Sequence, residues 1–163
     1  MWKSMTYGEL ELEDIPDRIL RYYGRVKMFG IPLQITIGTD SQTDSSTRIV
    51  TVIAVTCEGH GGIYFYTTTS VKKITNITQK LRLETQLSLE TGEQLCQLLN
   101  MHKYNCFMSN ATISIHVDAS NNPKGKTFSL VPEIVGWIKA CGYDCCIKPD
   151  SFAASSIADR LTK

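Results

Sequence analysis

Residues 35–42 read ITIGTDSQ and residues 113–120 read ISIHVDAS, so each stretch is a short apolar run that reaches an aspartate, Asp40 or Asp118. Side chains alternate across a strand, which places each aspartate on the small or polar face, near the carboxyl end. Two buried carboxylates close together are costly unless a cation or a proton compensates them. Hard divalent ions such as Mg2+ and Mn2+ prefer such oxygen ligands. The pair predicts a metal site; capping of turns after strands is the alternative for either aspartate.

Length and composition narrow the class of protein. The chain has 163 residues and a formal net charge of +1, which predicts one domain with its own core and disfavours coating of nucleic acid by bulk electrostatics. No apolar run is long enough for a membrane span, and no secretory signal is visible, so no membrane partner is expected. The six cysteines fit no regular framework, which indicates reduced thiols in a cytoplasmic protein.

The order of elements along the chain predicts an α/β fold. Residues 1–32 are expected to form a helical lead-in, and residues 33–163 a single domain. Runs of β-branched and aromatic residues alternate there with turns and with stretches rich in Leu, Gln and Glu. The domain is predicted to contain three antiparallel strands, then helix, strand, helix, strand and helix, at residues 33–42, 48–56, 63–69, 77–104, 111–118, 130–141, 144–148 and from 149 onward.

These elements predict a mixed five-stranded sheet with helices on both faces. Right-handed crossovers place the fourth and fifth strands beyond the first, which gives the order 3-2-1-4-5 with strand 2 antiparallel. The first and fourth strands are then adjacent and parallel, and their connections leave in opposite directions. Ligands bind at such a switch point, where Asp40 and Asp118 are expected side by side.

A third carboxylate is expected from the first long helix. That helix follows a strand that runs toward the edge carrying Asp40, so its first turns lie at that edge. Glu84, Ser88 and Gly92 are spaced at i, i+4 and i+8 and share one stripe. The small residues at two of these positions predict close packing on the sheet, which aims Glu84 inward. A solvated helix glutamate is the alternative.

The fourth carboxylate has two candidates, and the sequence leaves both open. Asp150 follows the fifth predicted strand and is expected at the same edge as the other acids. Asp159 lies nine residues further, about 13 Å along an ideal helix, so this geometry favours Asp150. Yet Asp150 also has a ready role as a helix cap, whereas Asp159 follows alanines and serines small enough to pack tightly.

Two further residues flank the paired aspartates. His116 shares the strand face of Asp118 and is placed to orient a carboxylate or a water, with a merely packed histidine as the alternative. Lys148 lies at the same edge and is placed to bind phosphate, with a solvated surface lysine as the alternative.

Four motifs carry a resemblance to a known family. They are GTDSQ at 38–42, HVD at 116–118, EIVGW at 133–137 and the longer IKPDSFAASSIADR at 147–160. On these motifs the chain resembles the YkuK-type ribonuclease H-like family over nearly its whole length, from about residue 33. The resemblance implies a ribonuclease H-like fold and a nuclease activity.

The resemblance also implies roles for individual residues. Proteins of that fold place acids at the end of the first strand, in the first long helix, at the end of the fourth strand and at the last helix. The matching positions here are Asp40, Glu84, Asp118, and Asp159 or Asp150, with Asp159 counted among the ligands of two Mg2+ or Mn2+ ions. Contacts to phosphate or to these acids are expected from Ser41, Gln42, His116, Lys148 and Ser151.

The leading hypothesis is a metal-dependent nuclease that hydrolyses phosphodiester bonds of RNA, an RNA–DNA hybrid or branched DNA by a two-metal mechanism. Its rival is a non-catalytic nucleic-acid-binding or regulatory module on the same fold, which the near-neutral charge favours. A third class is an ATP-using member of the broader fold, with residues 38–40 near phosphate. No glycine-rich phosphate loop of the usual spacing supports that class.

Overall fold

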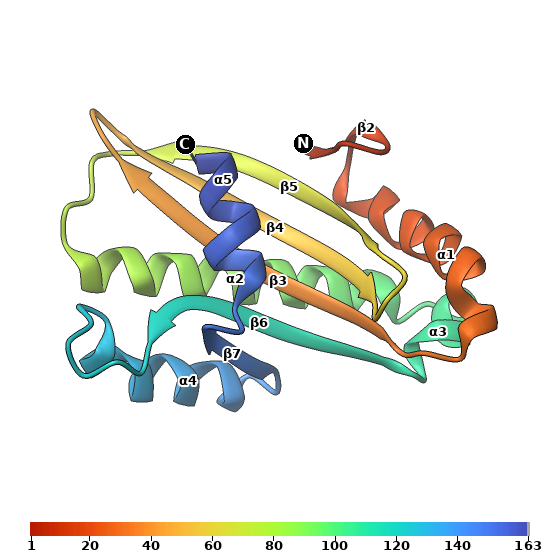
Figure 1. Ribbon diagram of the computed structural model, residues 1–163. Helices are drawn as coiled ribbons and strands as arrows, with labels where there is room; N and C mark the ends of the chain where they lie inside the picture. Colours follow the sequence, from red (N-terminus) through yellow and green to blue (C-terminus); the bar gives the residue numbers. More distant parts are fainter. Residues whose placement is uncertain (163) are drawn as a thin grey trace.

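Alternating β-branched residues build a seven-stranded sheet in the computed structural model, which describes residues 1–162 (Figure 1). The strand order is β2-β1-β5-β4-β3-β6-β7. β3 runs antiparallel to β4 and β4 antiparallel to β5, whereas β6 is parallel to β3 and β7 parallel to β6. The strands are β1 (Trp2–Ser4), β2 (Gly8–Leu10), β3 (Leu33–Thr43), β4 (Thr47–Cys57), β5 (Gly62–Val71), β6 (Ala111–Ser120) and β7 (Asp144–Lys148).

The central part of the sheet has the predicted order, but the predicted count of five strands is wrong. The strands β5-β4-β3-β6-β7 correspond to the expected order 3-2-1-4-5. β1 and β2 come from the lead-in, where only helix was expected. Each has three residues, too few for an alternating pattern to be visible in sequence, and β1 is paired to the sheet through Lys3 and Tyr66 of β5.

Helical segments connect the strands and end the described chain. The helix predicted over 77–104 ends at Leu99, and a short turn and helix follow it before β6. Asn76 caps its start by accepting a hydrogen bond from the N–H of Gln79 at 3.0 Å. The helices are α1 (Ile15–Val26), α2 (Ile77–Leu99), α3 (Asn105–Met108), α4 (Val131–Ala140) and α5 (Asp159–Thr162). Shorter turns are η1 (Leu12–Asp14), η2 (Lys27–Phe29), η3 (His102–Tyr104), η4 (Phe128–Leu130) and the π-helical η5 (Ala153–Ala158).

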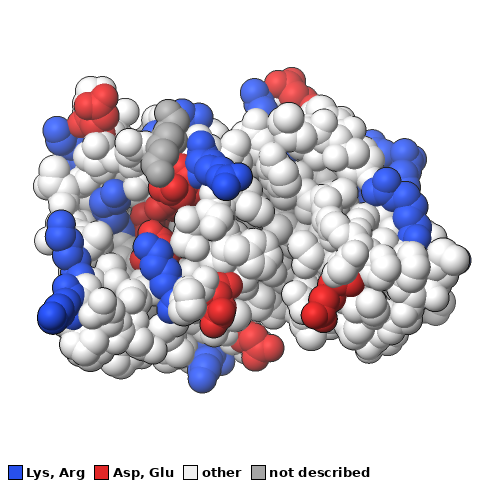
Figure 2. Space-filling model, in the orientation of Figure 1, with Lys and Arg blue, Asp and Glu red and all other residues white. Residues whose placement is uncertain are grey.

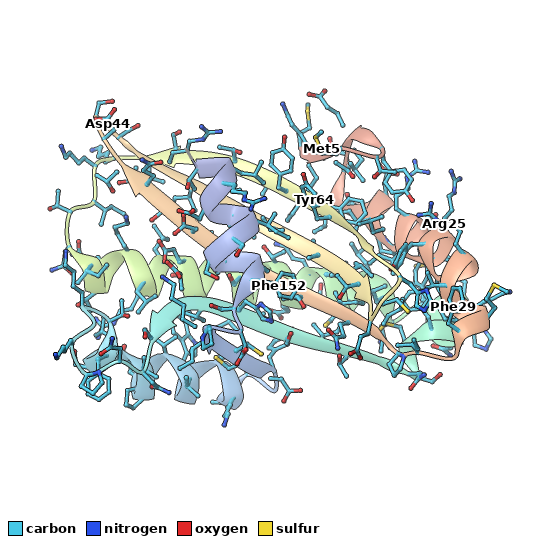
Figure 3. All side chains as sticks on the ribbon, viewed as in Figure 1. Met5, Arg25, Phe29, Asp44, Tyr64 and Phe152 are labelled. Atoms are coloured by element: carbon cyan, nitrogen blue, oxygen red, sulfur yellow. The ribbon has the colours of Figure 1, made fainter. Side chains whose placement is uncertain are left out.

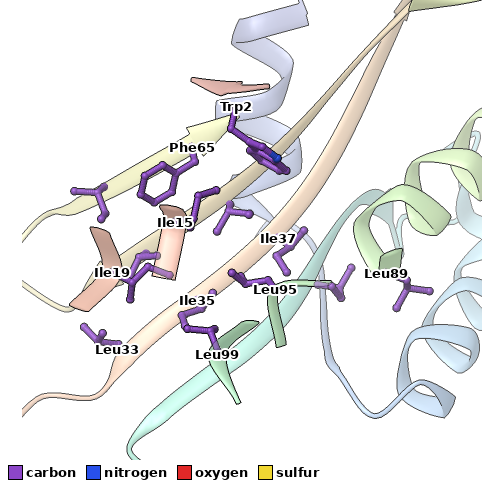
Figure 4. Packing of buried hydrophobic residues seen from close by; sticks show 14 of the residues in the cluster. Trp2, Ile15, Ile19, Leu33, Ile35, Ile37, Phe65, Leu89, Leu95 and Leu99 are labelled. Atoms are coloured by element: carbon purple, nitrogen blue, oxygen red, sulfur yellow. The ribbon is translucent and has the colours of Figure 1, made fainter. Parts of the chain in front are cut away.

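Both faces of the sheet are covered, as expected. On one face, Ile35 and Ile37 of β3 pack with residues of α1 and α2 in the main core (Figure 4). Ile15 and Ile19 of the lead-in belong to this same core, so residues 1–32 and the rest of the described chain pack together. On the other face, η5 and α5, here called the C-terminal segment, cross in front of the central strands (Figure 1). The predicted domain end at residue 163 lies outside the described residues.

The C-terminal segment approaches β3 at Gly38. A Cβ atom at this position would lie 2.6 Å from the backbone nitrogen of Ala154 and 2.8 Å from the carbonyl carbon of Ala153. Both alanines are fully buried. Only a glycine lets the two backbones come this close, so this contact fixes the segment next to Asp40. Within residues 1–162, no helix combines the length and apolar character needed to cross a membrane.

Candidate functional site

The sheet opens between β3 and β6 where the paired aspartates lie. The two strands pair from Leu33 and Ala111 as far as Gly38 and His116, and both continue beyond that point. Asp40 and Asp118 each follow two residues after this last pair. Parallel register therefore puts them at the same level on neighbouring strands, as the sequence predicted.

Asp40 faces the C-terminal segment. Its Oδ2 lies 3.0 Å from Oγ1 of Thr162, which is also 2.8 Å from the carbonyl oxygen of Asp159. The pKa of Asp40 is raised to about 6, mainly by burial; the charges of Asp118 and Asp159 contribute to this rise, while the hydroxyl of Thr162 opposes it. Three aspartates from β3, β6 and α5 therefore share one electrostatic environment.

Glu84 reaches the same place from α2, on the opposite face of the sheet. The hydroxyl of Ser41 donates to Oε1 of Glu84 at 2.5 Å, and both side chains are buried. Burial raises the pKa of Glu84 to about 8; Asp40 and Asp118 also raise it, whereas Ser41 and Lys80 lower it. Since the strands separate beyond Gly38, a carboxylate on the α2 face still interacts with the two aspartates on the other face.

The packing predicted for the Glu84 stripe is confirmed. Ser88 is buried, with its Oγ 2.8 Å from Oγ1 of Thr39, and Gly92 is buried next to Tyr143 and Ile37. This close approach of α2 to the sheet aims Glu84 inward rather than into solvent.

Asp118 has a cationic neighbour. Its Oδ1 lies 2.7 Å from Nζ of Lys148, whose side chain is 45% exposed. The angles of this ion pair are not those of a hydrogen bond, so this buried oxygen has no hydrogen-bond partner among residues 1–162. Figure 2 shows the acidic side chains near α5 in a hollow that Lys and Arg side chains surround.

Of the two late aspartates, the structure brings Asp159 to the acids and leaves Asp150 apart. Asp150 is exposed, and its charge acts on His116 and Cys146 instead. The chain turns back after β7, where the N–H of Asp150 donates to the carbonyl of Ile147 at 2.9 Å. The C-terminal segment then runs across the sheet and carries Asp159 to Asp40, a path that spacing along an ideal helix did not predict.

The remaining candidates have other surroundings. His116 is buried, and its Nδ1 accepts from the N–H of Ala153 at 3.4 Å. Its ring is nearly perpendicular to the ring of Phe152, which Figure 3 labels, at a centroid distance of 4.9 Å. Burial lowers the pKa of His116 to about 4, so it is a neutral packing residue that holds the start of the C-terminal segment. Ser151 is fully buried, and its Oγ has no hydrogen-bond partner within the described chain. Gln42 is exposed near the end of β3.

Sequence reasoning missed two residues at the site. Thr162 holds Asp40 through its hydroxyl, but a threonine at a helix end carries no distinctive pattern. Lys80 donates from Nζ to the carbonyl of Ser41 at 2.8 Å and lies one turn before Glu84. The i, i+4 spacing of a lysine and a glutamate is a signal that could have identified it.

These acids fit a divalent cation by their chemistry. Carboxylate oxygens are the donors that Mg2+ and Mn2+ prefer, and the buried Oδ1 of Asp118 lacks a hydrogen bond. Among the described side chains, no three or more of His, Cys, Asp and Glu stand together as a preassembled ligand group. The donors are therefore present and close, and their partners in this structure are two hydroxyls and a lysine.

Comparison with known proteins gives two matches. A family model described as "Ribonuclease H-like" matches residues 17–163. The chain is also 26% identical over 171 residues to "Uncharacterized protein YkuK" of Bacillus subtilis (strain 168), an alignment that covers 100% of this chain and 97% of the relative. No solved structure matches.

Proposed function

Because this chain belongs to the ribonuclease H-like family, we propose that it is a metal-dependent nuclease that hydrolyses phosphodiester bonds of RNA, an RNA–DNA hybrid or branched DNA. The observation that carries the proposal is the convergence of Asp40, Glu84, Asp118 and Asp159 at the opening between two parallel strands. Structural acids are normally dispersed or paired with cations, whereas acids whose charges raise the pKa values of neighbouring acids, as Asp118 does for Asp40 and Glu84, are costly and indicate a function.

The side chains around these acids support this chemistry. Two Mg2+ or Mn2+ ions held by the four carboxylates supply water activation and charge stabilisation when bound. Ser41 fixes the carboxylate of Glu84, and Thr162 fixes that of Asp40, so both donors are already oriented. Glu84, with a pKa of about 8, is mostly protonated at neutral pH and must lose this proton before it acts as a ligand, whereas Asp40, with a pKa of about 6, competes with protons mainly below neutral pH.

Local charge supports a nucleic acid as the partner. The net charge is only +1, but Lys and Arg side chains surround the acidic hollow (Figure 2). Lys80 and Lys148 adjoin individual acids, and Arg160 follows Asp159 on α5. Cations in this arrangement position a phosphate backbone without reading sequence. The six free cysteines support a cytoplasmic location, where thiols stay reduced.

The test is cleavage of a labelled panel of single-stranded RNA, RNA–DNA hybrid, duplex DNA and a four-way junction, with Mg2+ or Mn2+. The variants Asp40→Asn, Asp118→Asn and Asp159→Asn should each reduce the cleavage rate by more than roughly 100-fold. Loss of a residue that only supports a metal ligand typically costs roughly 10–100-fold, and loss of the ligand itself should cost more. Asp150→Asn should retain most activity, since this residue lies outside the acidic cluster, the name used here for Asp40, Glu84, Asp118 and Asp159. Asp44→Asn, in the exposed turn after β3, is the matched control.

A second candidate function is a nucleic-acid-binding module without turnover. The ion pair between Lys148 and Asp118 favours it, because this contact neutralises one acid without any metal ion. Binding of the panel by the wild-type protein, with no cleavage under any metal condition, would select this candidate. Cleavage that persists in Asp40→Asn would contradict the proposed role of the acidic cluster.

A further inference from the structure

In the ion pair between Lys148 and Asp118, a long, half-exposed lysine side chain contacts a buried carboxylate oxygen. Nζ of Lys148 is 2.7 Å from Oδ1 of Asp118, and the two side chains are 45% and 25% exposed. Lys148 is the last residue of β7, an edge strand that pairs with β6 on one side. A lysine stem at the rim of a sheet can therefore swing away without breaking a backbone contact.

The geometry of the pair makes the contact replaceable. Oδ1 of Asp118 has the ammonium group as a charged neighbour but forms no hydrogen bond with any described residue. Asp40 and Glu84, by contrast, are each held by a hydroxyl in hydrogen-bond geometry. Lys148 thus supplies charge compensation at Asp118 rather than fixed orientation.

A divalent cation and an ammonium group cannot both be in contact with the same carboxylate oxygen at low cost, because the two positive charges repel each other. Binding of a cation at Asp118 therefore expels Nζ of Lys148 toward the exposed rim of the acidic hollow. A nucleic acid that reaches the acids must bring its phosphate oxygens across this rim. The released ammonium group is then a donor for a non-bridging oxygen of the backbone.

We propose that Lys148 is an exchangeable counter-ion that neutralises Asp118 in the metal-free protein and binds a substrate phosphate once a divalent cation has displaced it. This inference rests on the proposed function. Lys148 is then a positioning residue. It makes the metal bind before the nucleic acid, since its contact with phosphate becomes available only after the metal has bound.

The first arm of the test measures metal binding. Lys148→Met keeps the apolar stem and removes the charge, so Mn2+ no longer competes with the ammonium group. We expect calorimetry to show a dissociation constant for Mn2+ lower by about two- to fivefold, the range set by partly exposed ion pairs. Lys148→Arg should keep the wild-type value approximately. Lys139→Met, on the exposed side of α4, is the matched control.

The second arm measures affinity for an RNA–DNA hybrid over a range of salt concentrations, with EDTA and with Ca2+, a cation of similar oxygen preference. With Ca2+, the slope of log affinity against log salt should fall by about 0.7–0.9 in Lys148→Met, the value for one lost phosphate contact. With EDTA, the slope should not change, because Lys148 is then paired with Asp118. A lysine that merely lines the surface would change the slope equally in both conditions.

The outcomes separate this inference from the proposed function. Absence of Mn2+ binding by the wild-type protein would overturn both. Mn2+ binding that weakens in Asp118→Asn but is unchanged in Lys148→Met would overturn the role of Lys148 alone. An equal loss of nucleic-acid affinity with EDTA and with Ca2+ would also overturn it. Thermal unfolding of each variant checks that the substitution leaves the fold intact.

Discussion

At the scale of single residues, Glu84 shows how burial changes the protonation of a carboxylate. Burial raises its pKa from 4.5 to about 8, more than the hydrogen bond from Ser41 and the charge of Lys80 lower it. The folded protein therefore holds a proton at Glu84 that the unfolded chain releases above pH 4.5. The stabilising contribution of this protonated form is complete below that pH and is lost as the pH rises through about 8.

We predict that Glu84→Gln stabilises the metal-free protein at high pH. Glutamine keeps a hydrogen-bonding carbonyl toward Ser41 but carries no charge to bury. The gain should be about 4 kcal/mol at pH 8 and close to zero at pH 4, because each pH unit between the two pKa values contributes about 1.4 kcal/mol. Urea unfolding at both pH values measures this difference in the free energy of unfolding.

The control for this prediction is Glu90→Gln on the same helix. Glu90 is exposed and accepts a hydrogen bond from Gln86 at 2.8 Å, so its loss should change stability little at either pH. A destabilised Glu84→Gln at pH 8 would contradict burial as the cause of the raised pKa of Glu84.

At the scale of secondary-structure elements, the C-terminal segment completes the site. It carries Asp159 and Thr162 to Asp40, and its placement depends on direct backbone contact with Gly38 of β3. The neutral ring of His116 also holds its first turn by accepting from the N–H of Ala153. A change at the contact with β3 should therefore disturb the acids without touching them.

We predict that Gly38→Ala destabilises the protein by about 2–3 kcal/mol, the cost of forcing an atom into a packed contact. The added Cβ would lie 2.6 Å from the nitrogen of Ala154, a backbone atom that cannot rotate away. The Tm for thermal unfolding and the affinity for Mn2+ should both be lower than in the wild-type protein. Gly24→Ala is the matched control, since a Cβ there meets nothing within 4 Å in α1 and should raise stability by up to about 1 kcal/mol.

At the scale of the whole molecule, the acidic cluster joins elements from both faces of the sheet. β3, β6 and the C-terminal segment bring three aspartates from one face, and α2 brings Glu84 from the other. The fold holds these like charges together, so proton or cation binding must offset part of their repulsion. Protons and divalent cations are therefore expected to compete for the same carboxylates.

We predict that Mn2+ stabilises the protein more at pH 8 than at pH 5.5. At the lower pH, Asp40 and Glu84, with pKa values of about 6 and 8, retain protons that the metal must displace. His116, with a pKa of about 4, stays neutral at both values. With the ion at about 100 times its Kd at pH 8, the Tm should rise by about 5–10 °C. Equal gains at both pH values, or an undiminished gain in Asp118→Asn, would count against this competition.

Much of the fold and part of the site could be predicted from sequence because their signals are local. The alternation in β3 to β7 identified the five central strands, and crossover handedness then ordered them. The strands β1 and β2 were missed because three residues show no period, and pairing with a neighbour defines them. The position of Glu84 was predicted because the small residues Ser88 and Gly92 follow it at helical spacing.

The sequence by itself determined which residue types end the central strands and where the chain can turn, because these depend on near neighbours. It therefore placed Asp40 and Asp118 on adjacent parallel strands. Only the tertiary structure showed that Asp159, and not Asp150, lies near Asp40, and only it paired Lys148 with Asp118. These outcomes depend on how the C-terminal segment crosses the sheet and where β7 ends beside β6. Contacts between segments distant in the chain have no periodic signal, so their energies are settled only when the whole molecule packs.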